Sequence, residues 1–146
     1  MFNKIKFVAK LEKILTLLKN SKLEYLKASD KYDLSENKRF FNLQSTIRNR
    51  FFQEIISLLR SFNVEVENLV INRLNFEQIV ISSLGKNKHN HLFKCVEFDK
   101  KLVKIYSEAI EIFPESNLLK NQREKISKVV EENTQFLESV GVTLKS

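Results

Sequence analysis

Glycine and proline are scarce in this chain of 146 residues, which contains two glycines and one proline. An all-β protein needs many turns, and these two residue types supply much of the backbone geometry of turns. The apolar residues are mainly leucine, isoleucine and phenylalanine, and they are mixed with lysine and glutamate. The composition therefore excludes an all-β fold and predicts a mostly helical protein.

The chain also has only one cysteine and no long apolar run. Cys95 has no second cysteine with which to form an internal disulfide, so we expect a small core residue in a reducing compartment. No apolar run approaches the roughly 20 residues of a transmembrane helix. The N-terminal stretch MFNKIKFVAKLEKIL is basic and amphipathic, but charges interrupt it too often for a signal peptide. We therefore expect a cytoplasmic protein without a membrane span.

Motifs of common enzymes are missing as well. The sequence has no glycine-rich phosphate loop, no cysteine pair for zinc and no glycine-framed nucleophilic serine. Cys95 lies among apolar residues rather than in the electropositive, exposed setting of a reactive thiol. The two histidines, His89 and His91, are two residues apart and would face different sides of a helix. We therefore expect no catalytic residues, no metal site and no cofactor.

The net charge of +7 could indicate a partner such as nucleic acid or an anionic membrane. However, the excess consists mostly of lysines that are spread along every segment and interleaved with glutamates. The chain has no arginine-rich block and no basic run with interleaved aromatics. Such a distribution supports only non-specific, salt-sensitive association, so nucleic acid is not the favoured partner.

Four segments carry apolar residues at alternating spacings of three and four, which keep one face of a helix turned toward a partner. The first segment runs from about Lys4 to Lys31, and the second ends near Asn63. The third ends before Pro114, and the fourth ends before Gly141. In chain order the four stripes are Val8, Leu11, Leu15, Leu18, Lys22, Tyr25 and Ser29; Phe41, Gln44, Arg48, Phe51, Ile55, Leu58 and Phe62; Leu92, Cys95, Asp99, Leu102, Tyr106, Ala109 and Phe113; and Leu119, Gln122, Ile126, Val129, Asn133, Phe136 and Val140.

Particular residues at the ends of these segments predict helix caps. Asp33 with Glu36 three residues later is typical of a capping box that opens the second helix. Pro114 can serve as the first residue of the fourth helix. Gly141 stands where a C-cap glycine belongs.

The connections between the four segments differ in length. Tight joins between the first and second helices, and between the third and fourth, predict two antiparallel hairpins. The second and third helices are separated by the residues from Asn63 to Lys88, far more than a hairpin needs. Within this connection, INRLNFEQIVISSLG predicts a short helix that ends at Gly85.

We expect one domain over residues 1–146, with its core at about 4–140, because the length and the 42% hydrophobic content suit a single core. A four-helix bundle with one long crossover between the second and third helices is the ferritin-like arrangement. Simple up-down-up-down connectivity is the alternative, but it would not need so long a middle connection. The predicted fold class is therefore all-α and ferritin-like.

Polar residues interrupt the apolar stripes and predict a polar layer inside the bundle. A buried charge is costly unless it is paired and hydrogen-bonded. We therefore expect Asp99 to face Arg48, with Lys22 near enough to help or to extend outward to water. The three tyrosines are expected to be core aromatics with one hydrogen bond each. The members of the expected layer are Lys22, Gln44, Arg48, Asp99, Tyr106, Gln122 and Asn133.

A metal site is the alternative explanation for Asp99, because di-iron carboxylate sites lie at the centre of such bundles. Those sites need a glutamate from each of two helices and a Glu-x-x-His motif from each of the other two. The sequence contains no Glu-x-x-His, and both histidines precede the middle of the third helix. One acid beside two bases is also a poor setting for a divalent cation. A structural ion pair is therefore the favoured interpretation.

Several residues between about positions 8 and 140 match the pattern of a known family in order and spacing. They are Phe40-Phe41, Ile47-Arg48 and Phe51 in the second helix; Asn72-Arg73 and Phe76 in the connection; Glu97-Phe98-Asp99 and Tyr106 in the third helix; and Gln122 and Ile126 after the proline. On these residues, the chain resembles a bacterial four-helix-bundle domain of unknown function within the ferritin-like superfamily, of a type found in proteobacteria and Bacteroidetes.

The sequence departs from that family at several positions. Ile47 stands where the family has a glutamate, Phe98 where it has a small glycine, and Asn20 where its first helix carries an acid. In the fourth helix, Lys128 and Val130 lie near the place of a histidine or glutamate. The resemblance therefore implies the fold and names no reaction.

Three functions are consistent with the sequence. The favoured one is a non-enzymatic bundle that acts through self-association or through binding another protein, and the resemblance implies a role in stress physiology. The second is a degenerate or unusual metal-binding oxidoreductase that keeps Asp99 as a residual ligand. The third is non-specific binding to nucleic acid or an anionic membrane, which the net charge of +7 suggests.

Overall fold

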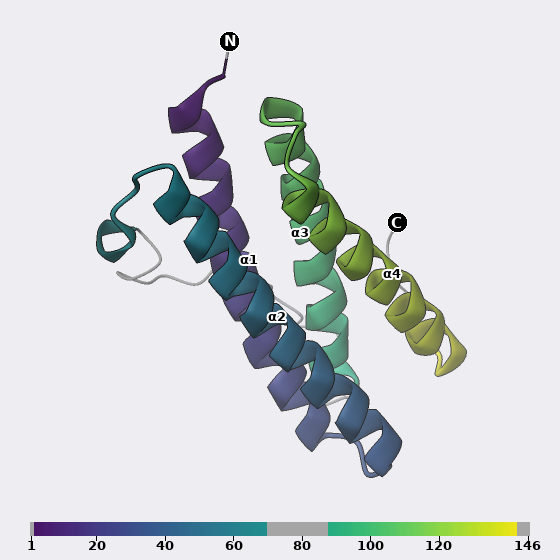
Figure 1. Ribbon diagram of the computed structural model, residues 1–146. Coiled ribbons are helices and arrows are strands. Elements are labelled where there is room, and N and C mark those ends of the chain that lie inside the picture. The colour runs from purple at the N-terminus through teal and green to yellow at the C-terminus, as the bar shows by residue number, and fades with distance from the viewer. Residues whose placement is uncertain (1, 70–87, 143–146) are drawn as a thin grey trace.

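The computed structural model describes residues 2–69 and 88–142, and within these ranges the chain is helical with no strand. The described ranges confirm the predicted all-α class and the four predicted helices. The short helix predicted at residues 71–85 lies outside the described residues. The elements, shown in Figure 1, are α1 (Lys4–Asp30), α2 (Ser35–Ser61), the 3-10 turn η1 (Val66–Asn68), α3 (Asn90–Ile112) and α4 (Asn117–Ser139).

Helix α1 is the central element, because it packs along both α2 and α3, whereas α4 packs on α3. A tight turn makes α1 and α2 antiparallel (Figure 1). Lys10 near the start of α1 bonds Glu108 near the end of α3, so α1 and α3 are antiparallel too. Consequently α2 and α3 are parallel, and their ends meet where the rings of Phe62 and Phe113 lie 5.8 Å apart. This direction differs from an up-down-up-down bundle, in which α2 and α3 would be antiparallel.

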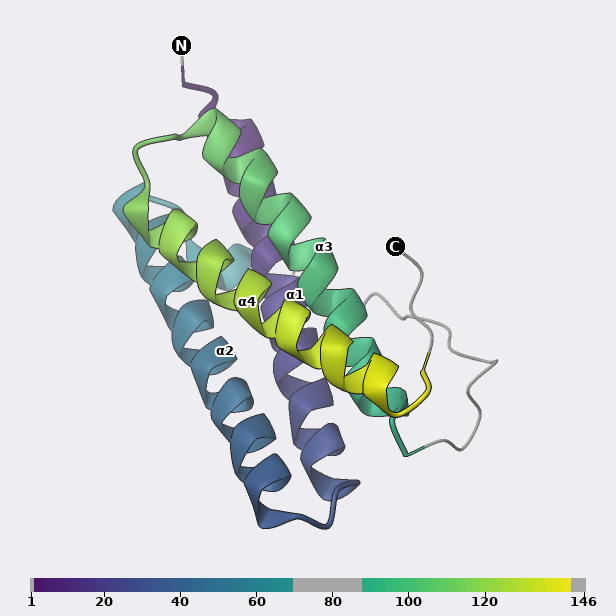
Figure 2. The ribbon, with the colours of Figure 1, turned by 90° about the vertical axis from the view of Figure 1, so that its right-hand side faces the viewer.

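Helix α4 crosses the bundle at an angle to α2 (Figure 2), and the backbones of these two helices approach less closely than those of the other neighbouring pairs. A long side chain bridges the distance: Nε2 of Gln122 in α4 donates to Oε1 of Glu54 in α2 at 2.9 Å. None of the four helices is long and apolar enough to cross a membrane, within the ranges that the structure describes.

The apolar interior consists of two clusters. The larger joins the first half of α1 to the second halves of α2 and α3, with residues such as Leu18, Phe51 and Leu102. The smaller lies toward the turn between α1 and α2 and includes Tyr25 and Cys95. Between them along each of these helices lie buried polar residues, which form the site described below.

The N-terminal caps differ from the two predicted ones. The capping box expected at Asp33 is wrong, because Leu34 occupies the N-cap of α2 and no side chain caps this end. The expected helix start at Pro114 is also wrong, since the N-cap of α4 is Ser116. The Ser116 hydroxyl accepts a bond from the backbone N–H of Leu119 at 3.2 Å. This bond satisfies an N–H group that would otherwise lack a partner, which explains why the helix begins after the serine.

The C-terminus of α4 has the glycine cap that the sequence predicted. Gly141 has a φ of +87°, in the left-handed region. Its N–H bonds the carbonyl of Glu138 at 3.1 Å, and the N–H of Val142 bonds the carbonyl of Leu137 at 2.9 Å. These two bonds form a Schellman motif, and the side chains of Val142 and Leu137 both belong to the smaller apolar cluster.

We expect Gly141→Ala to lower the free energy of unfolding by about 1 kcal/mol, because a residue with a Cβ is strained at this φ. A Cβ at this position would have nothing within 4 Å, so the loss would come from the backbone alone. Gly141→Asn is the control and should lose less, since asparagine tolerates the left-handed region better. Urea denaturation of the three proteins measures the difference. An alanine variant as stable as the parent would contradict the cap.

Candidate functional site

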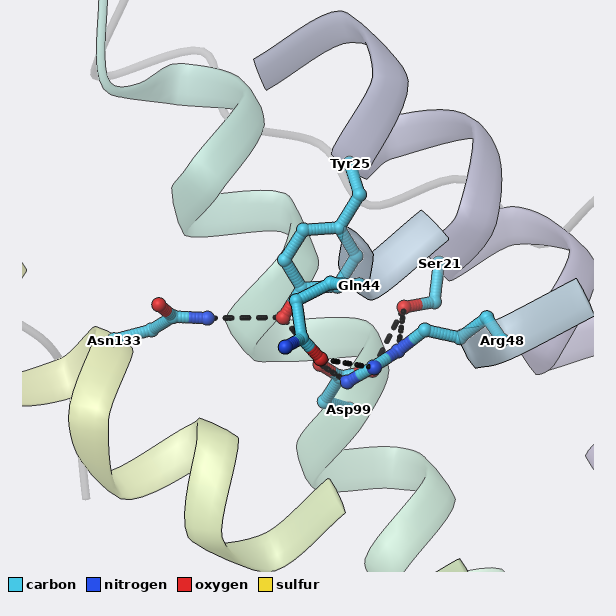
Figure 3. Close-up of polar contacts among 6 residues, drawn as sticks. All are labelled: Ser21, Tyr25, Gln44, Arg48, Asp99 and Asn133. Atoms are coloured by element: carbon cyan, nitrogen blue, oxygen red, sulfur yellow. Dashed lines mark hydrogen bonds and ion pairs between the residues drawn. The ribbon is translucent and has the colours of Figure 1, made fainter. Parts of the chain in front are cut away.

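The most polar part of the interior is centred on Arg48 of α2 and Asp99 of α3 (Figure 3). Their side chains are 1% and 0% exposed, respectively. Nη2 of Arg48 lies 2.8 Å from Oδ2 of Asp99 and donates a hydrogen bond to it. The structure thus brings together the two residues that the sequence predicted to be paired, from two helices that lie on either side of α1.

Helix α1 supplies two further donors to the carboxylate of Asp99 (Figure 3). The Ser21 hydroxyl donates to Oδ1 at 2.8 Å and accepts from Nε of Arg48 at 3.2 Å. The Tyr25 hydroxyl donates to Oδ2 at 2.8 Å. The guanidinium carbon of Arg48 also lies 4.7 Å from the centre of the Tyr25 ring, within cation–π range. Both oxygens of Asp99 are therefore held by donors of the protein itself.

Two amide side chains extend the network, and the second brings in α4, so that all four helices take part. Oε1 of Gln44 in α2 accepts from Nη1 of Arg48 at 2.7 Å. Nδ2 of Asn133 in α4 donates to the Tyr25 hydroxyl at 2.9 Å, as Figure 3 shows. We call these six residues the central network: Ser21, Tyr25, Gln44, Arg48, Asp99 and Asn133.

Tyr106 and Gln122, which the sequence placed in the same layer, form a second polar group farther toward the end of α3. The Tyr106 hydroxyl donates to Oε1 of Gln122 at 2.5 Å. Nε2 of Gln122 then donates to Glu54 at 2.9 Å and to the backbone carbonyl of Phe51 at 3.4 Å. This group ties α4 to α2 and α3 at the level where α4 begins.

The prediction that Lys22 belongs to the buried layer is wrong. Its side chain is only half-buried, and Nζ lies 3.4 Å from Oδ1 of Asn49 at the exposed junction of α1 and α2. A long aliphatic stem lets the ammonium group stay in water. A second buried cation would also leave the Arg48–Asp99 pair with an uncompensated charge. The preceding residue, Ser21, takes the interior place instead.

Ser21 and Tyr25 are the members of the network that sequence reasoning did not assign to it. They are four residues apart on one helix, so they lie on the same face. Tyr25 was expected only as a core aromatic, and Ser21 fell outside the stripe altogether. The available signal was that Asp99 needed more donors than Arg48 alone could provide.

Burial controls the protonation of the groups in and around the network. Burial, with the charge of Asp99, raises the pKa of Tyr25 well above its usual value. Burial likewise raises the pKa of Tyr106 and of the Cys95 thiol. Burial alone would lower the pKa of Arg48, but the neighbouring Asp99 and Tyr25 raise it overall. The network therefore contains a charged guanidinium and a neutral phenol that acts as a donor.

These shifts predict a loss of stability at alkaline pH. Because the folded-state pKa values of Tyr25 and Tyr106 lie above those of the unfolded chain, their contribution is complete below about pH 10 and is lost as pH rises above it. The free energy of unfolding should fall by up to about 1.4 kcal/mol per pH unit for each such tyrosine. Urea titrations at a series of alkaline pH values measure this slope.

Tyr106→Phe provides the control for the alkaline prediction. Phenylalanine cannot ionise, so this variant should show a shallower decline above about pH 10. An identical slope in the parent and the variant would contradict the assignment of the decline to buried tyrosines.

The two histidines lie at the start of α3 and have separate partners, as their spacing implied. Nδ1 of His89 lies 2.6 Å from the Tyr32 hydroxyl. Burial, followed by the charge of Lys88, lowers the pKa of His89, which favours a neutral ring that accepts from Tyr32. Nδ1 of His91 lies 2.9 Å from Oε2 of Glu24, a contact that joins α3 to α1.

The residues of the central network do not fit a divalent cation. Asp99 is its sole carboxylate, and a cation bound there would have to displace Ser21 or Tyr25 while lying beside the guanidinium of Arg48. Across residues 2–69 and 88–142, no group of three or more histidine, cysteine, aspartate or glutamate side chains is arranged to hold a metal. What the geometry does provide is a fully bonded polar connection among four helices.

Comparison of the chain with protein-family models finds no matching family. Comparisons with curated proteins and with solved structures find no match either.

Proposed function

We propose that this protein is a ferritin-like helical bundle that acts through its outer surface, by self-association or by binding another protein, and not through chemistry in its interior. The observation that carries the proposal is the state of Asp99. Its two oxygens accept bonds from Ser21, Tyr25 and Arg48, so the carboxylate is committed to the fold. The interior polar groups hold the four helices together, which leaves the surface for partners.

The directions of the helices support the ferritin-like part of the proposal. Two antiparallel hairpins, α1 with α2 and α3 with α4, are arranged so that α2 and α3 are parallel. A bundle with one long crossover connection has this pattern. In ferritin-like metal proteins the bundle centre carries carboxylate ligands, whereas here the Arg48–Asp99 pair occupies the centre. A role in stress physiology follows only from the resemblance to that superfamily, and the buried cysteine suits the cytoplasm.

Apolar side chains on the surface support the part of the proposal that concerns partners. Single exposed apolar residues are normal, but contiguous patches of them mark interaction sites. Two of those here, Leu23 and Leu26, are three residues apart on α1 and are therefore neighbours on its surface. The large apolar side chains exposed in the described ranges are Phe2, Ile5, Leu23, Leu26, Leu34, Leu43 and Val140.

Light scattering coupled to size-exclusion chromatography tests self-association. We expect the mass of the purified protein to exceed that of one chain and to rise with concentration. A mass of one chain at every concentration would contradict self-association and leave only a different protein as the partner.

Elemental analysis tests the exclusion of interior metal chemistry. The protein and its Asp99→Asn variant would be incubated with ferrous iron or manganese, desalted and analysed. We expect no stoichiometric metal in either sample. Stoichiometric metal in the parent that is lost in the variant would contradict the proposal and assign Asp99 as a ligand.

A further inference from the structure

The charges of α4 are divided between its two halves. The first half carries four basic residues and one acid, Glu124, whereas the second half carries three acids and no base. All of these side chains are exposed except that of Arg123, which is half-buried. The basic residues are Lys120, Arg123, Lys125 and Lys128, and the acids of the second half are Glu131, Glu132 and Glu138.

This division is unfavourable for an isolated helix. The N-terminus of a helix carries partial positive charge and its C-terminus partial negative charge, so acids are favoured in the first turn and bases in the last. Helix α4 has no acid in its first turn and no base in its last turn. Lys120 and Glu138 instead occupy these ends with the opposite signs. The macrodipole therefore does not account for the charge pattern.

Ion pairs between described residues do not account for it either. The ion pairs between described residues are Lys10–Glu108, Lys27–Glu24, Arg48–Asp99 and His91–Glu24, and none of them includes a residue of α4. Arg123 donates to the Ser107 hydroxyl of α3 at 3.1 Å, which is a neutral partner. The charges of both signs thus face outward.

A groove lies along the same surface, between α3 and α4. Val103 and Ser107 of α3 contribute to its lining, together with the basic residues Lys120, Arg123 and Lys128 and the acids Glu124 and Glu131. The groove therefore extends from the basic half of α4 into the beginning of its acidic half. A partner docked along the groove would contact both basic and acidic side chains.

We propose that this surface of α4 associates with the same surface of a second copy of the chain, with the two α4 helices antiparallel about a two-fold axis. Such a contact is symmetric, so every pair of residues across it occurs twice, once in each direction. The basic half of each helix therefore faces the acidic half of the other. The inference rests on the proposed function and names its surface. A polyanion such as nucleic acid would be repelled by the acidic half, so the charge pattern favours a second copy.

Charge variants of α4 test the arrangement. An acidic variant carries Lys120→Glu, Lys125→Glu and Lys128→Glu, and a basic variant carries Glu131→Lys, Glu132→Lys and Glu138→Lys. Both sets of changes are at exposed positions, and Lys120→Glu and Glu138→Lys also suit the macrodipole, so both proteins should fold, as circular dichroism would verify. We expect the parent to be a dimer by light scattering at low salt. Each variant alone should have the mass of one chain, and an equimolar mixture should regain the mass of two.

A matched control changes three exposed basic residues outside α4, none of them in an ion pair between described residues, as Lys13→Glu, Lys31→Glu and Arg60→Glu. The control protein should remain a dimer. If the control is monomeric, net charge and not the α4 surface explains the loss of the dimer, and the inference is overturned. A parent dimer that persists in both α4 variants would overturn the α4 surface but leave self-association intact. A parent that is monomeric at every concentration, at low salt as well, would overturn both.

Discussion

Asp99→Ala is expected to lower the free energy of unfolding by about 3–5 kcal/mol, because it strands a buried cation. Arg48 is 1% exposed and would keep its charge without the carboxylate that now lies 2.8 Å away. Ser21 and Tyr25 would lose their acceptor at the same time. Urea denaturation followed by circular dichroism measures the loss as a lower transition midpoint.

Glu111→Ala is the matched control, since Glu111 is an exposed acid on the same helix. Its effect should stay within about 0.5 kcal/mol, as for most surface substitutions. An Asp99→Ala variant that is as stable as this control would show that the carboxylate is not needed to hold the bundle together.

Phe7→Ala should lower the free energy of unfolding by a similar amount, about 3–5 kcal/mol, through the cavity that it leaves. Phe7 is fully buried. Its ring centre lies 5.5 Å from that of Phe2, 5.5 Å from that of Phe62 and 5.4 Å from that of Phe113. These rings join the start of α1 to the ends of α2 and α3, so the change should weaken three helix ends at once.

Phe2→Ala is the control for that prediction. Phe2 stacks on Phe62 with ring centres 5.6 Å apart, but it is 39% exposed. Its loss should cost about 1 kcal/mol, the order of a single aromatic pair, because water already reaches part of the ring. Equal losses for the two variants would contradict the assignment of Phe7 as the centre of the cluster.

The stripe of α3 shows what the sequence could predict. Six of its seven expected residues are buried, and Phe113 at the end is half-buried. The same periodicity placed Asp99 inside, and the cost of an unpaired buried charge then pointed to Arg48 as its partner. The fold class and this pairing were accessible because helical spacing fixes a face and electrostatics restricts what an interior charge can meet.

The face of α1 was harder to predict, because this helix packs on both α2 and α3. A single stripe describes contact with one neighbour, but α1 buries a second face that includes Phe7, Ile14 and Leu17. Ser21 lies on that wider surface, and a serine carries no apolar signal to reveal it. Lys22 was placed in the layer because it continued the stripe, and of the two courses expected for it the structure shows the outward one.

The charge pattern of α4 was hidden by averaging over the whole chain. Lysines and glutamates are interleaved overall, yet within α4 they separate into a basic first half and an acidic second half. The separation can be recognised only once the boundaries of α4 and the exposure of its charged side chains are known.

The central claim is that Asp99 is committed to Arg48 inside the fold and not to a ligand. A double-mutant cycle of Asp99→Ala, Arg48→Met and the two combined tests it most directly. We expect the double variant to be more stable than Asp99→Ala alone, with a coupling free energy of about 2–3 kcal/mol, because methionine removes the stranded charge and fills most of its space. If the two losses simply add, the residues do not act as a pair, and Asp99 has some other role in the protein.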